Sequence, residues 1–553
     1  MTWSEVFEVD EIDLMGRRGK LYTRRGVVET PTLTPVINPG KQIIPPKEIR
    51  EIGFPMLITN SYIIKRNYGD LAKELTVHGI LGVDGPVYTD SGAYQLLVYG
   101  KVEVDPLEIF TYQIEIGSDV GVILDIPTRR DTPYHQARIE VEETLRRLRE
   151  AVKVDRKGML LVAPIQGGVY TDLVAYSASQ ASREPADLFA VGGPTQFMEE
   201  YDYKELVKLV MTARLNLPWG APLHLFGAGH PIIMPLAVAM GVDLFDSASY
   251  ALYARDDRLI TPRGTLRLEE VEELPCVCPV CSKYSARELK GLPKQERVRL
   301  IAQHNLYVIH LELKRIKQAI HEGRLWDLVE EKTRGHPSLM EAFKLYVKYA
   351  EFIAKVHPVT RPRIQGVFFY DSFSRYRPEV VRHVNRLKSR YRGKSEILLL
   401  FEETPHKPFT RFGLIKELLN DRPEIINECD IAVLSRAFSI IPIELDGLYP
   451  LSQYEASSAV LEGTANEIKE DVVWFALNKG YRGVVLVYYS LPREFVLGLL
   501  RRLSGEQIIA LHLKLRDYYV ALQEHVKTSE EILRAVKAIK ELVTRGIEGV
   551  PSL

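Results

Sequence analysis

The chain has 553 residues, of which 46% are hydrophobic and 26% are charged, and this composition excludes disordered and low-complexity proteins. Its 72 basic and 73 acidic residues leave a net charge of −1, so a nucleic-acid surface would have to be local. No apolar run approaches the ~18 residues of a membrane span, and the first residues do not resemble a secretory signal. We therefore expect a cytoplasmic protein with no membrane partner.

The first 250 residues contain eight short apolar runs, and each reads as a strand buried on both faces. Helical patterns fill most of the gaps, for example at 133–154, 203–215 and 231–240. This alternation predicts the α/β class and a (β/α)₈ (TIM) barrel, because eight units in ~250 residues suit a barrel better than a doubly wound open sheet. The runs lie at 34–38, 56–60, 87–91, 121–125, 161–166, 189–193, 224–229 and 244–247.

Polar residues or glycines end nearly every run. In a barrel the C-terminal strand ends share one mouth, where active sites lie, although Asp, Asn and Gly also end strands because they favour turns. Clustered carboxylates repel one another and cost stability unless they serve a function, which favours an active site here. The residues are Asn60, Asp90, Asp125, Gln166, Gly193, Gly229 and Asp246.

Three of the four cysteines lie within six residues, at Cys276, Cys278 and Cys281. With His304 they supply three thiolates and an imidazole, a set that suits a structural tetrahedral zinc with no open position. His310 and His321 are alternative fourth ligands. We expect one zinc per chain, inserted after the barrel strands.

The rest of the chain predicts helices at 293–323, 325–333 and 338–356, and then a linker. Strands return at 366–370, 396–402, 431–435 and 483–489, as in a smaller α/β domain. The tail predicts a helix with Ser529 as N-cap and Gly546 as C-cap, and its apolar stripe is Ile532, Val536, Ile539 and Val543. The expected domains are a catalytic barrel with the zinc site (1–357), a smaller α/β domain with possible RNA contact (358–500) and a helical segment (501–553).

Two carboxylates at strand ends, Asp90 and Asp246, suit displacement at an anomeric carbon, with one as nucleophile and the other as acid/base. A catalytic metal is the alternative, but the first barrel strands show no His-x-His or similar ligand pattern. The residue pattern favours glycosidic chemistry.

Three motifs resemble those of tRNA-guanine transglycosylases. Residues 88–95 (YTDSGAYQ) resemble the Thr-Asp-Ser-Gly-x-aromatic-Gln motif, 241–247 (GVDLFDS) resembles the nucleophile segment, and the Cys-x-Cys-x₂-Cys cluster with a distant His matches the zinc site. Residues 246–258 are more similar to the archaeal branch, which makes archaeosine, than to the bacterial queuosine branch. The resemblance covers residues 10–345 closely and continues more loosely to 500.

The resemblance implies that guanine in the tRNA D-arm, at position 15, is replaced by 7-cyano-7-deazaguanine. Asp246 would attack the ribose and form a covalent aspartyl-RNA intermediate, while Asp90 would act as general acid/base. Tyr94 and Phe226 would sandwich the base, and His224 reads as a structural histidine. The edges of the base would be bound by Ser91, Asp125, Gln166, Gly192 and Gly193.

Contacts to RNA are expected at two basic segments. Arg129 and Arg130 follow Asp125 and are candidate phosphate contacts, and a stretch at 375–394 either grips phosphates or forms a solvated helix face. The resemblance implies tRNA and a second copy of the chain as partners. Archaeal relatives commonly end in a PUA domain, which we do not expect in the last ~50 residues, so either a separate PUA-domain subunit supplies this module or the protein manages without it. The basic stretch comprises Arg375, Arg377, Arg382, Arg386, Lys388, Arg390, Arg392 and Lys394.

Two other functions remain open at this point. One is a paralogue with changed chemistry, such as the archaeosine amidine-forming enzyme, and the other is a non-catalytic RNA-binding subunit. The presence of Asp90, Asp125 and Asp246 together favours the transglycosylase.

Overall fold

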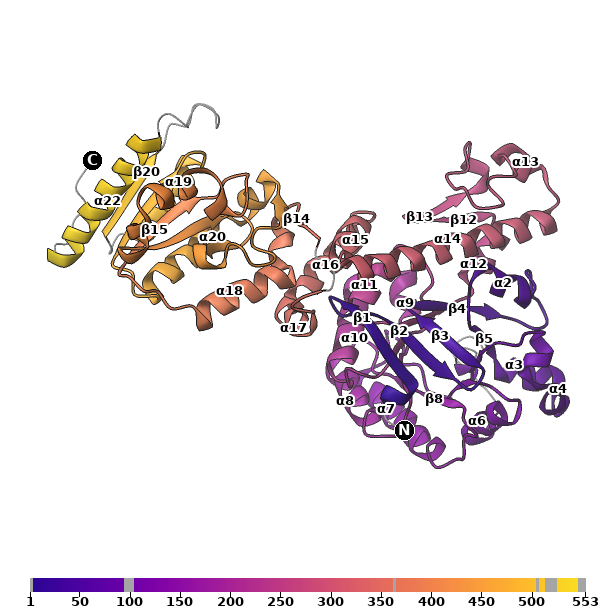
Figure 1. The fold of residues 1–553 in the computed structure, drawn as a ribbon. Helices are drawn as coiled ribbons and strands as arrows, with labels where there is room; N and C mark the ends of the chain where they lie inside the picture. Colours follow the sequence, from indigo (N-terminus) through magenta and orange to yellow (C-terminus); the bar gives the residue numbers. More distant parts are fainter. Residues whose placement is uncertain (1–2, 94–103, 362–364, 504–506, 513–524, 546–553) are drawn as a thin grey trace. The chain divides into compact units, whose positions relative to one another are not determined.

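The computed structural model describes residues 3–93, 104–361, 365–503, 507–512 and 525–545 (Figure 1). The chain divides into two compact units, residues 1–348 and 349–553. Among the helices within these ranges, none combines the length and the apolar character that a membrane crossing requires.

The N-terminal unit is built on a closed barrel of eight parallel strands, so the predicted α/β barrel is confirmed. The strands follow chain order around the ring, and the last closes it by pairing with the first. Most strand residues are buried, as expected for strands with a packed interior on one side and helices on the other. The strands are β4 (Thr32–Ile37), β5 (Leu57–Asn60), β6 (Val87–Asp90), β7 (Val120–Val122), β8 (Leu160–Ile165), β9 (Leu188–Val191), β10 (Leu223–Leu225) and β11 (Leu244–Ser247).

Helices surround the barrel, and most of them bury one face, whereas α11 is buried along its whole length. In α7 the buried residues recur at helical spacing, from Ala137 through Val141 and Leu145 to Leu148, because only one stripe of the helix faces the strands. The helices are α2 (Pro46–Ile52), α3 (Ser61–Tyr68), α4 (Leu71–Leu81), α6 (Pro106–Glu115), α7 (Tyr134–Ala151), α8 (Thr171–Ala181), α9 (Thr195–Glu199), α10 (Tyr203–Leu215), α11 (Met234–Ala239) and α12 (Ser249–Arg255).

An antiparallel sheet of three strands precedes the barrel and closes one of its ends. Phe7 joins the core cluster inside the barrel. Arg17 donates to Asp243 at 3.0 Å and Arg24 to Asp119 at 3.2 Å, and these two carboxylates stand just before β11 and β7. The sheet therefore covers the N-terminal strand ends and leaves the C-terminal mouth uncovered by it. Its strands are β1 (Phe7–Asp13), β2 (Gly16–Thr23) and β3 (Gly26–Thr30).

A lobe after the last barrel strand combines a hairpin with a long helix. Asn305, on α14, holds the two together, because its Oδ1 accepts from the Ile260 N–H at 2.6 Å and its Nδ2 donates to the Tyr250 carbonyl at 3.1 Å. Since Tyr250 lies in α12, directly after β11, the lobe is tied to the strand that carries Asp246. The elements are β12 (Arg258–Thr261), β13 (Gly264–Arg267), α13 (Ala286–Gly291), α14 (Lys294–Glu322), α15 (Leu325–Thr333) and α16 (Pro337–Tyr346).

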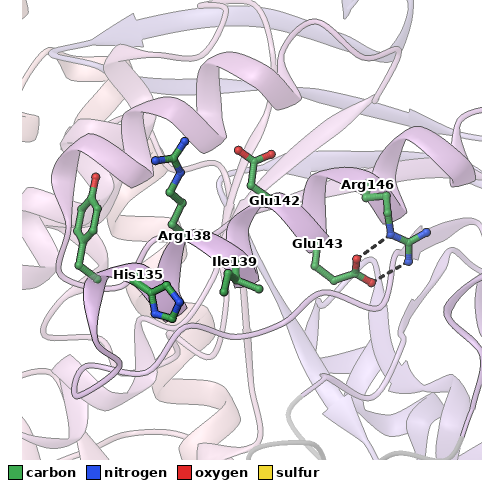
Figure 2. Close-up of a pocket in the computed structure, with 7 residues that line it drawn as sticks. His135, Arg138, Ile139, Glu142, Glu143 and Arg146 are labelled. Atoms are coloured by element: carbon green, nitrogen blue, oxygen red, sulfur yellow. Dashed lines mark hydrogen bonds and ion pairs between the residues drawn. The ribbon is translucent and has the colours of Figure 1, made fainter.

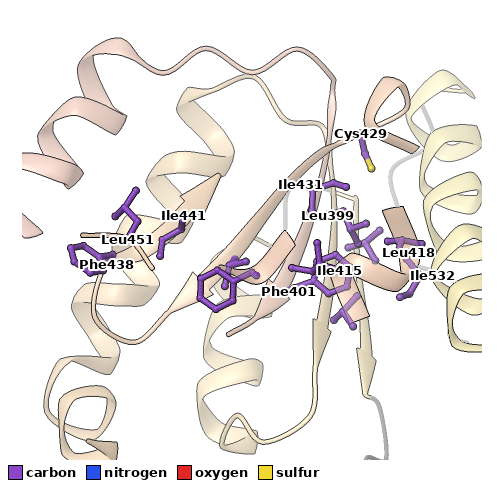
Figure 3. Close-up of a cluster of buried hydrophobic side chains, with 14 of the residues drawn as sticks. Leu399, Phe401, Ile415, Leu418, Cys429, Ile431, Phe438, Ile441, Leu451 and Ile532 are labelled. Atoms are coloured by element: carbon purple, nitrogen blue, oxygen red, sulfur yellow. The ribbon is translucent and has the colours of Figure 1, made fainter. Parts of the chain in front are cut away.

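The C-terminal unit contains a five-stranded sheet in the order β17-β16-β15-β19-β20, in which only β17 is antiparallel. Alternate residues of its central strands enter two different cores, since Leu399 belongs to one and Leu400 to the other. Figure 3 shows the core that contains Leu399. The strands are β15 (Ile397–Glu402), β16 (Asp430–Ser435), β17 (Ser439–Pro442), β19 (Gly483–Tyr488) and β20 (Gln507–His512), beside a separate pair, β14 (Val367–Phe369) and β18 (Tyr454–Ala456). The α-helices are α17 (Ala350–Val356), α18 (Pro378–Arg390), α19 (Gly413–Asp421), α20 (Ser458–Asn478), α21 (Arg493–Arg502) and α22 (His525–Arg545).

The tail of the chain differs in part from its prediction. The apolar stripe of α22 is buried as expected, from Ile532 (0% exposed) to Val543 (6%). The helix begins at His525, so Ser529 lies inside it and its prediction as the N-cap is wrong. Gly546 lies outside the described residues, and β20 stands in a stretch expected to be helical.

Candidate active site

Three carboxylates stand at the C-terminal end of the barrel. Asp90 ends β6, Asp246 lies near the end of β11, and Asp125 comes shortly after β7. Burial, followed by the charges of Asp246, Asp90 and Asp125, raises the pKa of the buried Tyr88 hydroxyl well above its ordinary value. Because such effects weaken with distance, all three carboxylates lie around one region at the barrel mouth.

Asp90 is held in position by its neighbour on β5. Its Oδ2 accepts a hydrogen bond from Asn60 Nδ2 at 3.0 Å. Burial, followed by the negative charges of Asp125 and Asp246, raises the pKa of Asp90 from its ordinary 3.8 to about 7, against two opposing backbone hydrogen bonds. A carboxyl group with this pKa exists in both protonation states near neutrality, which is the property of a general acid/base.

Asp246 is held through a single oxygen. Its Oδ1 accepts from the Gly227 N–H at 2.8 Å and lies 3.0 Å from His224 Nε2. The fully buried His224 also places its Nδ1 3.3 Å from the Tyr88 hydroxyl. Oδ2 of Asp246 has no hydrogen-bond partner within the described ranges, so it is the oxygen available to attack a substrate.

A polar wall lies beside these two residues. Gln166 Nε2 donates to Asp125 Oδ2, and Gln166 Oε1 accepts from the Thr128 N–H at 3.1 Å. Burial raises the pKa of Asp125 to about 6, although the hydrogen bond from Gln166 opposes the shift. A Cβ at Gly192 would lie 2.1 Å from Gln166 Nε2, so only glycine leaves room for this amide.

The remaining expected base-binding residues lie along the same rim, with one exception. Ser91 is buried and donates to the Ile123 carbonyl at 3.0 Å, and Gly193 adopts a φ of 70° that favours glycine. Phe226 packs edge-on against His224, with ring centroids 4.7 Å apart. Tyr94 lies outside the described residues.

Two residues at the mouth contact the carboxylates in a way that the sequence analysis does not predict. Asn60 reads in the sequence as one strand-end residue among several, and His224 reads as a structural histidine. Asn60 and Asp90 are 30 residues apart on the neighbouring parallel strands β5 and β6, and His224 and Asp246 lie on the neighbouring parallel strands β10 and β11. A signal was available for Asn60, because the barrel prediction already places β5 beside β6.

Arg130 is not free for the phosphate contact that the sequence suggests. Its guanidinium pairs with Glu200 and Asp202, each at 2.6 Å, and lies over the ring of Phe197. It therefore braces two loops at the mouth. Arg129 is exposed and lies 3.4 Å from the exposed Asp131.

A surface hollow of about 510 Å³ is separate from this site. All the residues that line it belong to α7, and Figure 2 shows them along the side of that helix, where Glu143 and Arg146 pair. None of the carboxylates at the mouth lines it, so it is not part of the carboxylate site.

The cysteine cluster forms a candidate metal centre. The ligand atoms of Cys276, Cys278, Cys281 and His304 all lie within 4.8 Å of one another and could hold a metal ion. His304 turns Nδ1 toward the thiols, 3.2 Å from Cys281 Sγ, while its Nε2 lies 2.9 Å from the Ile260 carbonyl. Such a hydrogen bond orients a ligating imidazole, so the donor set fits a soft tetrahedral metal.

The alternative histidines are occupied elsewhere. His310 packs edge-on against Phe54, and His321 lies 2.6 Å from Glu11. His304 is therefore the histidine of the cluster.

Comparison with known proteins gives consistent matches. Residues 13–338 match the family model described as queuine tRNA-ribosyltransferase. A tRNA-guanine(15) transglycosylase of Pyrobaculum aerophilum is 45% identical over 81% of this chain and 90% of its own length. Proteins with the same description from Saccharolobus solfataricus (42% identical, 87% of this chain, 96% of the relative) and Methanocaldococcus jannaschii (44%, 81% and 68%) are also similar.

Proposed function

The chain belongs to the queuine tRNA-ribosyltransferase family and is a tRNA-ribosyltransferase, and from this premise we propose the base that it inserts and the residues that carry the reaction. Its relatives named tRNA-guanine(15) transglycosylase support the exchange of a guanine in tRNA. We propose that the guanine is at position 15 in the D-arm and that 7-cyano-7-deazaguanine replaces it, as a step of archaeosine biosynthesis.

The first half-reaction would form an ester between protein and RNA. Oδ2 of Asp246 attacks C1′ of the guanosine as the bond from C1′ to N9 breaks. The leaving guanine takes a proton from Asp90, whose raised pKa makes the protonated form available at neutral pH. The base has to leave the RNA stack to reach the mouth.

The second half-reaction reverses these roles. The ionised Asp90 removes a proton from the five-membered ring of 7-cyano-7-deazaguanine, and the ring nitrogen attacks C1′. The bond from C1′ to Asp246 breaks, which frees the carboxylate for another cycle.

Recognition of the base would use the polar wall and the aromatic residue at the rim. A carboxylate such as Asp125 accepts from the N–H groups of a guanine edge, while the Gln166 amide and the backbone N–H groups at Gly192 and Gly193 donate to its carbonyl. We propose Ser91 as a further edge contact. Phe226 and Tyr94 are proposed to stack on the ring in place of the lost RNA stacking.

The observation that carries this proposal is the meeting of Asp90 and Asp246 at one mouth, one with a pKa near neutrality and the other with a free oxygen. Mass spectrometry of tRNA nucleosides after incubation with 7-cyano-7-deazaguanine tests it. Incorporation is expected; a protein that binds tRNA but incorporates neither guanine nor the deazapurine would be the non-catalytic subunit instead.

His224 should matter for catalysis through its contact with Asp246. Replacing it with phenylalanine removes a polar partner of a charged group, and such a loss lowers kcat by about 10–100-fold. The KM for tRNA should change little, and His224→Gln, which keeps a donor, should recover part of the rate. Unchanged kcat in His224→Phe would show that the Gly227 N–H alone suffices to hold Asp246.

We propose that the metal of the cysteine cluster is a structural zinc. Bound there, it would cross-link the segment at 276–281 to α14, which Asn305 connects to the strand of Asp246. All four ligands come from the protein, which leaves no position for a catalytic water.

Removal of one ligand should release the metal and lower stability. Cys281→Ser is expected to reduce the zinc content measured by plasma mass spectrometry and to lower the thermal unfolding midpoint by several degrees, at about 2–4 °C per kcal/mol lost. His310→Ala, on the same helix but outside the cluster, serves as the matched control and should retain its zinc. Full zinc in Cys281→Ser would exclude this residue as a ligand.

A further inference from the structure

The C-terminal unit contains a cavity of about 320 Å³ whose lining combines basic and apolar residues. Its volume is at the lower end of the range for small-ligand sites, about the size of a nucleotide. Four arginines line it, Arg361, Arg382, Arg386 and Arg390. Three of them recur every four residues on α18 and so share one face of that helix.

Within the described residues, only two basic side chains of the basic stretch at 375–394 are available to bind a ligand. Arg382 donates to three backbone carbonyls, and Lys388 pairs with Asp471 at 3.0 Å. Arg386 and Arg390 are exposed and have no hydrogen-bond or ion-pair partner in the described part of the chain. The other cations are also engaged: Arg375 with Asp471 and Ser439, Arg377 with the Phe368 carbonyl, Arg392 with the Tyr391 carbonyl and Lys394 with Glu444.

The charge inside the cavity is not cancelled by its own lining. Of the described residues that line it, only Glu379 is acidic, and this side chain is 9% exposed and lies 3.7 Å from His357 and 3.6 Å from Arg377. The two free guanidinium groups therefore face a concavity with excess positive charge. Guanidinium forks match the geometry of phosphate oxygens.

Part of the lining is apolar. It comes from the segment at 445–451 and includes Leu445 and the unusually exposed Leu448, 58% of whose surface is accessible. A phosphate alone would not need such a wall, whereas a nucleotide brings a flat apolar base or a ribose together with its phosphate.

We propose that this cavity binds a phosphate-bearing nucleotide, with the phosphate on Arg386 and Arg390 and the base or ribose against the 445–451 wall, and that tRNA supplies it. The inference rests on the proposed function only in taking tRNA as the substrate. The protein would then contact tRNA at two places, the barrel mouth where the base is exchanged and this cavity outside the barrel.

The test compares two double variants of the full-length protein with the same loss of charge. Arg386→Ala/Arg390→Ala removes two of the four arginines that line the cavity. Arg493→Ala/Arg501→Ala removes two exposed arginines of α21 that do not line the cavity and have no partner within the described ranges. The dissociation constant for tRNA is measured from low to high salt, and base exchange is measured with varied tRNA. Thermal unfolding midpoints check that both variants fold.

The cavity variant is expected to bind tRNA about 10-fold more weakly, and the salt slope should fall by about 1.4 because each contact to single-stranded RNA contributes roughly 0.7. KM for tRNA should rise while kcat stays within about twofold. The control variant should keep the wild-type slope. Equal dissociation constants and slopes in wild type and cavity variant would overturn the inference.

A second experiment distinguishes a free nucleotide from tRNA as the ligand of the cavity. AMP and inorganic phosphate are titrated against wild type and cavity variant. If the variant loses AMP affinity but keeps wild-type tRNA binding, the cavity takes a free nucleotide and the assignment to tRNA is wrong. If wild type shows no base exchange but the tRNA slope still depends on the two arginines, the proposed function fails while this inference stands.

Discussion

Replacing Asp246 with alanine is expected to abolish base exchange, with a loss of at least about 10³-fold, because the ester between protein and RNA cannot form. Wild-type protein incubated with tRNA in the absence of an acceptor base should give a covalent adduct that survives denaturing electrophoresis. The alanine variant should give no adduct, although it should bind tRNA and unfold at a similar temperature.

The matched control is Asp84→Ala, which removes an exposed carboxylate from the opposite end of β6. It should exchange guanine at the wild-type rate. Normal turnover in Asp246→Ala, or an adduct that persists in it, would mean that another side chain attacks the ribose.

Asp90→Asn is expected to slow exchange by about 10²–10⁴-fold, the range that a general acid/base contributes. The amide keeps the size of the carboxyl group but neither donates nor accepts a proton in the way the reaction requires. Single-turnover measurements of guanine release and of labelled guanine uptake should both slow. A variant that retains full rates in both would exclude Asp90 from proton transfer.

The pH dependence follows from the pKa of Asp90, which burial and the charges of Asp125 and Asp246 raise to about 7. Expulsion of guanine needs the protonated group and should decline as the pH rises past 7. Uptake of the new base needs the ionised group and should decline below 7, so complete turnover is greatest near neutrality. Both limbs assigned to Asp90 should disappear in Asp90→Asn.

The raised pKa of Asp90 also predicts how the stability of Asp90→Asn depends on pH. Measuring this stability distinguishes a loss of activity from a failure to fold. A carboxyl group with a raised pKa binds its proton more tightly in the folded protein, so its contribution to stability is lost as the pH rises from about 4 to 7. Asparagine cannot ionise and escapes this loss. Asp90→Asn should therefore unfold at the same or a higher temperature than wild type at pH 8.

The barrel could be predicted because its strands are buried on both faces, which leaves uninterrupted apolar runs such as Leu160–Ile165. The N-terminal sheet could not, because its strands have charged residues between the apolar ones, as in β2, where Arg17 is buried only because Asp243 pairs with it. That partner is 226 residues away in the chain, and no local pattern reveals it.

The candidate site divides in the same way. Asp90, Asp125 and Asp246 could be found from strand ends and motifs, and the cysteine spacing predicts the candidate metal centre. The contact between His224 and Asp246 depends on the register between β10 and β11, and the pairing of Arg130 depends on the loop that carries Glu200 and Asp202. Charge in a sequence does not show whether a guanidinium group is already paired.

The sheet of β1 to β3 restricts how bases enter and leave the barrel. It closes the N-terminal end of the barrel. In the proposed mechanism the expelled guanine and the incoming base therefore use the same C-terminal mouth, while the RNA would remain covalently bound to Asp246. The two bases would then compete for one binding site, so free guanine is expected to inhibit uptake of the incoming base competitively.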